Sequence, residues 1–462
     1  MDNSQYLPVR HVCLLLMPVR SALIESPGLS FRFEVTGLKE ARYDSFLSST
    51  LRGAMTDDPL IRTRLVFHLG GYDPHMLPEK SYRRFIRELK RFEKTWCAAA
   101  AVSPLSVAAD EATWQITTTG PNWRVETRYC LVRWDDIIKA VARRPWWQRF
   151  PLSQVAFLDF TAAGALWGYI RTNWRYALFF LYPFLLFDIF IIIAWFTGDF
   201  LTKVSGSIWI GVIAGLLMLV ALVRGPSRWL GIVTLFDDWI FSTNYIHAGY
   251  PVLEKRFDFI AKDIDTAARS AHVDEILVVG HSLGAVLAID LLDRVLKGNP
   301  SIGVSLPRVA FLSVGSSILK IGLHRGARRF RGSLQRVAAA SGIFWAEYQA
   351  LTDVMNFYKT NPVSEVGLTA IDRPAVRIVK IRNMLDPASY RRIRRNFYRV
   401  HNQFISGNER RTPYDYFMLV CGPLSARQQV ESPDGAASAF DANGALIGSD
   451  PDHHEPNHHA AA

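Results

Sequence analysis

The sequence predicts an α/β fold with a mostly parallel central sheet, interrupted by a two-helix transmembrane hairpin. Three observations support this prediction. Short runs rich in β-branched and aromatic residues alternate with segments of helical periodicity. One apolar run, 276–279, leads through a glycine-bracketed turn into a helical segment, which Gly298 and Pro300 can end. Two long apolar runs lie in the middle of the chain.

The repeated alternation of strand and helix is typical of a parallel sheet covered by helices. The expected strands are 64–67, 113–118, 123–134, 276–279, 309–314, 343–351 and 376–381. A charged amphipathic helix is expected over 79–96, and another helix over 252–270, ahead of the strand 276–279.

The two apolar runs, 176–197 and 206–223, are each long enough to cross the hydrocarbon core of a bilayer. Only Pro183 and Asp188 interrupt the first run, and the second carries no charge. Tryptophan and tyrosine near the ends of both runs are typical of membrane interfaces. These features favour a membrane hairpin, with a pair of buried core helices as the alternative.

Arginines flank the hairpin on its outer sides, whereas its short connection holds only Asp199 and Lys203. By the positive-inside rule, both outer flanks lie in the cytoplasm. The sequence therefore predicts an integral protein of the plasma (inner) membrane, with its catalytic domain on the cytoplasmic side. The flanking arginines are Arg143, Arg144, Arg149, Arg171, Arg175, Arg224 and Arg228.

A formal net charge of +11 would also suit a nucleic-acid-binding protein, but the sequence contains no nucleic-acid-binding motif. The basic residues cluster beside aromatic ones in segments 324–331 and 390–399. In a membrane-tethered protein, such segments favour contact with anionic lipid head groups, and ordinary solvated helix faces are the alternative. Histidines and the four cysteines show no ligand spacing, so neither a metal nor another cofactor is expected.

The segment Gly280-His281-Ser282-Leu283-Gly284 has the form G-x-S-x-G between an expected strand and an expected helix. So sharp a turn leaves no room for side chains at Gly280 and Gly284, and it exposes the Ser282 hydroxyl above the sheet edge. The backbone N–H of Leu283, at the start of the helix, is then free to stabilise an oxyanion.

From these residues, the chain resembles the serine lipase/esterase branch of the α/β-hydrolase superfamily. The resemblance is close over 273–300, fair over 63–74 and thin elsewhere. It implies that the strand 64–67 leads into an oxyanion loop, His68-Leu69-Gly70-Gly71, where Leu69 or Gly70 supplies the second N–H donor. An ordinary glycine-containing turn is the alternative there.

The resemblance also implies the chain order serine, acid, histidine. Asp353 directly follows the strand 343–351 and is the preferred acid, with Asp372 and Asp386 as competitors. His401 is the preferred base because it alone lies beyond all three acids and before the polar C-terminal region.

Five regions follow from this interpretation: an N-terminal extension (1–56), the first half of the hydrolase domain (57–173), the hairpin (174–224), the second half (225–427) and a disordered tail (428–462). The predicted activity is that of a membrane-bound serine hydrolase cleaving an ester, with lipid as the substrate class and membrane lipids as partners. A catalytically silent scaffold of the same fold, binding lipid or a partner protein at the membrane, is the alternative.

Overall fold

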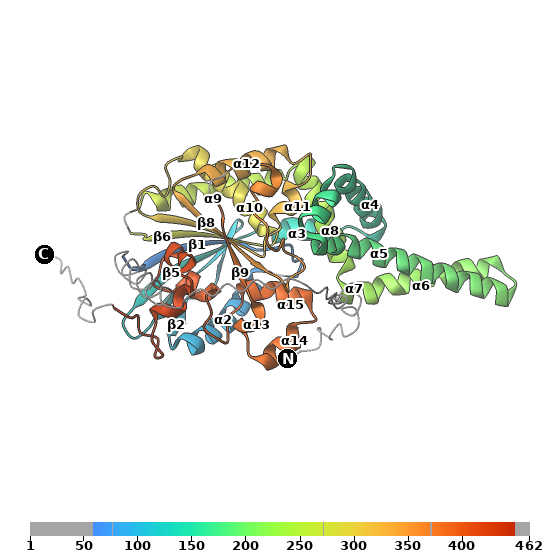
Figure 1. Ribbon diagram of the computed structural model, residues 1–462. Coiled ribbons are helices and arrows are strands. Elements are labelled where there is room, and N and C mark those ends of the chain that lie inside the picture. The colour runs from blue at the N-terminus through green and yellow to red at the C-terminus, as the bar shows by residue number, and fades with distance from the viewer. Residues whose placement is uncertain (1–58, 76, 271, 370–371, 449–462) are drawn as a thin grey trace, which may run out of the picture.

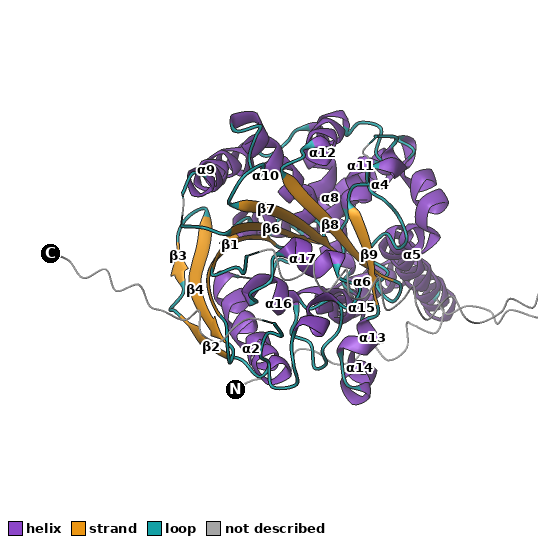
Figure 2. Cartoon of the chain, turned by 60° about the vertical axis from the view of Figure 1, so that its left-hand side comes forward, coloured by secondary structure: helices purple, strands orange, loops and turns teal. Residues whose placement is uncertain are grey.

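The computed structural model describes residues 59–448 except 76, 271, 370 and 371. The predicted N-terminal extension (1–56) lies outside the described residues. Within them, the chain forms an α/β domain around one mixed, mostly parallel sheet of nine strands (Figures 1 and 2). This agrees with the fold class expected from the alternating pattern of strands and helices.

The strands run in the order β2-β4-β5-β1-β6-β7-β8-β9, with β3 paired beside β4. Strands β5, β1, β6, β7, β8 and β9 run parallel to one another. Strand β4 runs antiparallel to its three partners, β2, β3 and β5. The strands are β1 (Thr63–Leu69), β2 (Ala99–Val102), β3 (Ser106–Val107), β4 (Glu111–Thr119), β5 (Arg124–Val132), β6 (Glu275–His281), β7 (Arg308–Val314), β8 (Ile343–Ala350) and β9 (Ala375–Val379). The carboxyl ends of the parallel strands therefore meet at one edge, where ligands bind in open α/β sheets.

Helices cover both faces of the sheet, as Figure 2 shows. Every residue of β6 is buried. Its side chains alternate between two cores, because successive residues of a strand point to opposite faces. Ile276 and Val278 pack on the side of α9 (Pro251–Ala268), α10 (Gly284–Gly298) and α12 (Arg328–Ala339). Leu277 and Val279 pack on the side of α2 (Pro78–Trp96) and α16 (Tyr416–Cys421).

A helical insertion separates β5 from β6 in the sequence. It consists of α3 (Asp135–Ala142), α4 (Trp146–Ala162), α5 (Ala165–Ser205), α6 (Ile208–Arg224), α7 (Pro226–Leu230) and α8 (Ile232–His247), ahead of α9. Helix α5 is broken at Asn173, where φ is −154° and ψ is 93°. Beyond this break, α5 and α6 run side by side and project away from the domain (Figure 1).

The two projecting helices pack closely through small residues. A Cβ added to Gly211 of α6 would lie 2.5 Å from the carbonyl oxygen of Gly198 of α5. Close backbone approach of this kind is common between helices in membranes. By length and composition, α5 could cross a membrane, whereas α6 is apolar but shorter. A helix of this kind can equally belong to the core of a soluble protein.

The region predicted as a disordered tail is folded as far as it is described. Residues 428–448 include most of α17 (Ala426–Glu431) and a turn of 3₁₀ helix (Gly435–Ala439). The ring centroid of Phe440 lies 5.5 Å from that of Trp96 and 5.9 Å from that of Trp123. The expectation of disorder is therefore wrong for 428–448, because distant aromatic residues supply the core that this polar segment lacks. Residues 449–462 lie outside the described part.

Candidate active site

Ser282 lies at a sharp turn between β6 and α10, at the carboxyl edge of the sheet. Its φ is +56°, a left-handed conformation that is uncommon for serine and marks a strained turn. A Cβ on Gly280 would lie 2.4 Å from Cα of Ala285, and one on Gly284 would lie 1.9 Å from the carbonyl oxygen of Leu69. Both glycines are therefore sterically required, as the G-x-S-x-G pattern predicts.

The loop after β1 lies directly against this turn. A Cβ on Gly71 would lie 2.8 Å from Cβ of Ser282 and 3.3 Å from its Oγ. Leu69 is the last residue of β1 and pairs in register with Gly280. Of the two residues expected to donate an N–H to the oxyanion, Leu69 thus belongs to the strand and Gly70 to the loop. The loop residue that approaches Ser282 is Gly71. The sequence interpretation did not single out Gly71.

The N–H of Leu283 is available for an oxyanion. Leu283 precedes the first turn of α10, and its N–H has no hydrogen-bond partner among the described residues. Such a group at a helix N-terminus favours negative charge. By contrast, the carbonyl of Ser282 is engaged, because it accepts from the N–H of Ser317 at 3.1 Å.

His401 and Asp353 form a buried pair beside this turn. Nδ1 of His401 lies 2.7 Å from Oδ2 of Asp353, and the two side chains are 4% and 0% exposed. Asp353 follows β8, where its Oδ1 accepts from the N–H of Met355 at 2.9 Å. In the tautomer that donates Nδ1–H to this carboxylate, Nε2 is the nitrogen that can accept a proton.

Nε2 of His401 is buried and has no hydrogen-bond partner among the described residues. The centroid of its ring lies 4.5 Å from that of His281, the residue before Ser282, with the two rings tilted by 35°, and a Cβ on Gly315 would lie 3.1 Å from its Cε1. His401 is therefore held beside the Ser282 turn, and no hydrogen bond joins it to the Ser282 hydroxyl among the described residues. Catalytic hydrogen bonds are often long in unliganded enzymes and shorten when substrate binds.

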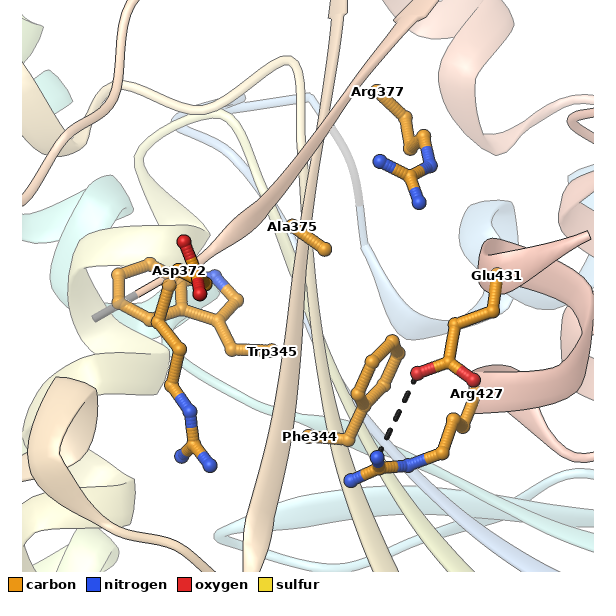
Figure 3. A pocket seen from close by; sticks show the side chains of 8 residues that line it. Phe344, Trp345, Asp372, Ala375, Arg377, Arg427 and Glu431 are labelled. Carbon is orange, nitrogen blue, oxygen red and sulfur yellow. Dashed lines mark ion pairs between the residues drawn. The ribbon is translucent and has the colours of Figure 1, made fainter. Parts of the chain in front are cut away.

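The competing acids lie elsewhere. Asp386 precedes α14 (Pro387–Ile393), where its Oδ1 accepts from Nε of Arg410 at 3.1 Å, and its side chain is 60% exposed. Asp372 lies before β9 and lines a separate pocket (Figure 3). That pocket is near the amino ends of β8 and β9, whereas Ser282 is at the carboxyl edge. Neither acid pairs with His401 among the contacts of the described residues.

Two polar groups that support the site were not found from the sequence. Arg84 of α2 holds the turn after His401, donating to the Oδ1 of Asn402 at 2.8 Å and to the Oγ of Ser406 at 3.0 Å. Glu347 of β8 accepts from the hydroxyls of Ser313 and Ser316, beneath the loop that follows β7. Burial raises the pKa of Glu347 to about 7. Their partners lie too far away in the sequence to leave a local pattern.

A further polar trio joins the insertion to the main domain. His247 Nε2 lies 3.0 Å from Asp159, and His324 Nε2 lies 3.2 Å from it. These ligand atoms are close enough together to hold a metal ion. However, Nδ1 of His324 accepts the Gly326 N–H at 3.0 Å, so in the neutral ring Nε2 carries the proton. A protonated Nε2 faces Asp159 and cannot ligate a metal, which favours a structural polar cluster over a metal site.

Comparison with known proteins identifies no relative: no protein-family model matches the chain, and no curated protein or solved structure is significantly similar to it.

Proposed function

We propose that this chain is a membrane-bound serine hydrolase of the α/β-hydrolase type, which cleaves an ester of a lipid-like substrate through an acyl-enzyme. The observation that carries the proposal is the buried His401–Asp353 pair beside Ser282, which has a strained, left-handed backbone. A serine hydroxyl needs a base to take its proton, and that base needs an acid to fix its tautomer.

In the proposed reaction, Oγ of Ser282 attacks the ester carbonyl carbon while Nε2 of His401 takes the hydroxyl proton. The carbonyl oxygen becomes an oxyanion, held by the N–H of Leu283 and by the N–H of Leu69 or Gly70. Collapse of this intermediate breaks the ester bond, and His401 gives its proton to the leaving alcohol. Water then attacks the acyl-enzyme with His401 again as base, releasing the carboxylic acid and restoring Ser282.

The sheet supports the family assignment. The turn follows β6, a central strand, and the acid and the base follow in chain order after later strands, as in α/β hydrolases. The antiparallel strands are confined to the β2–β4 side, away from the catalytic loops.

Exposed apolar surface supports the membrane assignment. Helix α4 buries Ser153, Ala156 and Phe160, and its opposite stripe, facing outward, is also apolar. In this stripe Val155 is 56% and Leu158 63% exposed. In α5, Trp167 and Trp174 are also exposed, and many apolar side chains of the projecting hairpin are exposed as well. A helix that is apolar on its solvent side is expected to lie at a membrane surface.

The basic segment 390–399 supports contact with lipid head groups. It lies near the base of the hairpin: the ring centroid of Phe397 is 6.1 Å from those of Phe179 and Tyr182. Its arginines are exposed. The segment 324–331 is less suited to this role, because Arg329 pairs with Glu254, and Arg331 donates to the carbonyls of Gly322 and His324. The proposed orientation keeps the catalytic domain on the cytoplasmic side of the plasma membrane.

Hydrolysis of short-chain acyl esters by the purified full-length protein in detergent tests the proposed activity. We expect turnover by the native chain and none above background by Ser282→Ala, at equal folded protein. Equal rates from both chains would refute the mechanism, and no turnover from either would favour the silent scaffold.

A further inference from the structure

One short segment, residues 314–317, holds the backbone of the proposed nucleophile on both sides. The N–H of Ser282 donates to the carbonyl of Val314 at 3.2 Å, and the carbonyl of Ser282 accepts from the N–H of Ser317 at 3.1 Å. Val314 is the last residue of β7, so the segment starts at the carboxyl edge of the sheet. A displacement of the segment would therefore displace Ser282 as well.

The same segment lies against the proposed base. Gly315 has a φ of +54°, and a Cβ there would lie 3.1 Å from Cε1 of His401 and 2.8 Å from Cδ2 of Phe404. The N–H of Gly315 donates to the carbonyl of Tyr348 in β8 at 2.9 Å. The segment thus borders the histidine ring while it holds the serine, so its position sets the distance between the two.

Glu347 of β8 fastens this segment through two hydroxyl groups. The Glu347 residue is 2% exposed and lies opposite Ser313 in the register of β7 and β8. Its Oε1 accepts from the hydroxyl of Ser316 at 2.6 Å, and its Oε2 accepts from the hydroxyl of Ser313. One planar group with two acceptor oxygens therefore joins β7 to the segment that follows it.

A carboxyl group at this position is costly for the fold. Burial raises the pKa of Glu347 to about 7, and no cation among the described residues offsets this effect. Glu347 forms no contact with Ser282 or His401 among the described residues, so it does not act as the acid of the base. A buried group that lowers stability is expected at positions that serve function.

We propose that Glu347 is a positioning residue of the reaction, which binds the hydroxyls of Ser313 and Ser316 and so fixes the segment 314–317 between Ser282 and His401. This role rests on the proposed function, because Ser282 and His401 must be the groups that react. Misplacement of reacting groups lowers the rate of the chemical step. The acylation rate of Ser282, rather than the affinity for the ester, should therefore depend on both hydrogen bonds.

The test measures kcat and KM for p-nitrophenyl butyrate, and the rate of fluorophosphonate labelling, with the purified full-length protein in detergent. Glu347→Met keeps the size of the side chain and removes both acceptors, so kcat and the labelling rate should fall by at least about 30-fold, with KM within about 2-fold of native. Ser316→Ala removes one bond and should lower both rates by about 5- to 10-fold.

The double variant Glu347→Met/Ser316→Ala tests whether the two residues act together. It should be no slower than Glu347→Met alone, because both changes remove the same hydrogen bond. Rate losses that simply multiply in the double variant would contradict the connection between Glu347 and the segment.

Glu347→Gln should restore the rates that Glu347→Met loses. The amide oxygen can accept from Ser316, and the amide nitrogen can donate to Oγ of Ser313, whose own hydroxyl can donate to the carbonyl of Ala346 at 3.2 Å. We expect kcat within about 3-fold of native, the effect of a hydrogen bond that is replaced rather than lost. Equal losses in the Gln and Met variants would overturn the proposal.

Ser333→Ala is the matched control. It removes a buried serine hydroxyl that donates to a buried carboxylate, that of Asp293 at 2.9 Å, where α12 packs on α10. Both rates should stay native in this variant. A loss as large as that of Ser316→Ala would overturn the proposal, since the rate would then follow stability.

Native rates in both Ser316→Ala and Glu347→Met, with the native chain active, would overturn the role of Glu347 and leave the hydrolase proposal intact. If Glu347→Met does not fold, Ser316→Ala decides, because it keeps the carboxyl group and removes one hydroxyl. If the native chain neither hydrolyses the ester nor reacts with the fluorophosphonate, the proposed function fails and the role of Glu347 fails with it.

Discussion

Nδ1 of His401 lies 2.7 Å from Oδ2 of Asp353, although the two residues are 48 positions apart in the chain. The tight turn after β8 fixes the acid, because Asn356 donates to the carbonyls of Ala350 and Asp353. Arg84 fixes the turn after the histidine. The pair is thus set by contacts from several elements, which holds the ring in one orientation at the nucleophile turn.

Replacement of the acid should abolish most of the activity. Asp353→Asn keeps the shape of the side chain but favours the wrong tautomer of His401, so we expect kcat for an acyl ester to fall about 10³- to 10⁴-fold. Asp386→Asn is the matched control, because Asp386 is exposed and pairs with Arg410. The kcat of this variant should stay close to that of the native chain. Steady-state kinetics on both variants checks this, and the opposite ranking would assign the acid to Asp386.

The approach of Gly71 to the nucleophile should limit substitution there. Gly71→Ala adds a Cβ 2.8 Å from that of Ser282, so it should displace the loop and lower kcat/KM by at least about 10-fold. Gly298→Ala is the control, since an added Cβ there meets nothing within 4 Å and alanine favours the helix. Similar kinetics for the Gly71→Ala variant and the native chain would show that the loop does not shape the oxyanion site.

The buried acid beneath the site should make the stability of the fold depend on pH. Burial raises the pKa of Glu347 from 4.5 to about 7, so the folded state binds its proton more tightly than the unfolded state. Its contribution is fully present below pH 4.5 and is lost as pH rises to about 7. The shift in the pKa of Glu347 corresponds to at most about 3 kcal/mol of unfolding free energy. In the Glu347→Gln variant, the free energy of unfolding should therefore fall less steeply than in the native chain between pH 4.5 and about 7. Denaturant titration at several pH values measures this slope. A slope equal to that of the native chain would contradict the assignment.

The proposed hairpin predicts a definite topology. A reporter fused after Thr202, near the end of α5, should lie outside the cell, and one fused after Gly231, beyond α7, should lie in the cytoplasm. The arginine-rich flanks supply the physical reason. Both reporters on the cytoplasmic side would instead assign α5 and α6 to a soluble domain.

Local patterns were sufficient for much of this fold. The strand–turn–helix around Ser282 could be predicted because its glycines and apolar runs are contiguous in the sequence. The boundaries of β6, β7 and β8 match the expected strands within one residue at nearly every end. The structure also brings together His401 and Asp353, the two residues that the sequence favoured as base and acid.

Contacts between residues that are far apart in the sequence could not be predicted from such local patterns. Arg84 and Asn402 are separated by 318 positions, and the polar segment around Phe440 is folded only because Trp96 and Trp123 lie against it. Asp237 and Asp238 of α8, each with an Oδ1 atom that has no hydrogen-bond partner among the described residues, likewise look like ordinary helix residues in the sequence. Their environment arises only when α8 packs beside the loops of the site.

Covalent labelling tests the central claim most directly. The full-length protein is treated with a fluorophosphonate probe, which reacts with an activated serine, and the modified residue is located by peptide mass spectrometry. We predict a single adduct on Ser282, absent from Ser282→Ala and strongly reduced in His401→Ala because the base is missing. No adduct on the native folded chain, or an adduct that persists in Ser282→Ala, would contradict the assignment of Ser282 as the nucleophile.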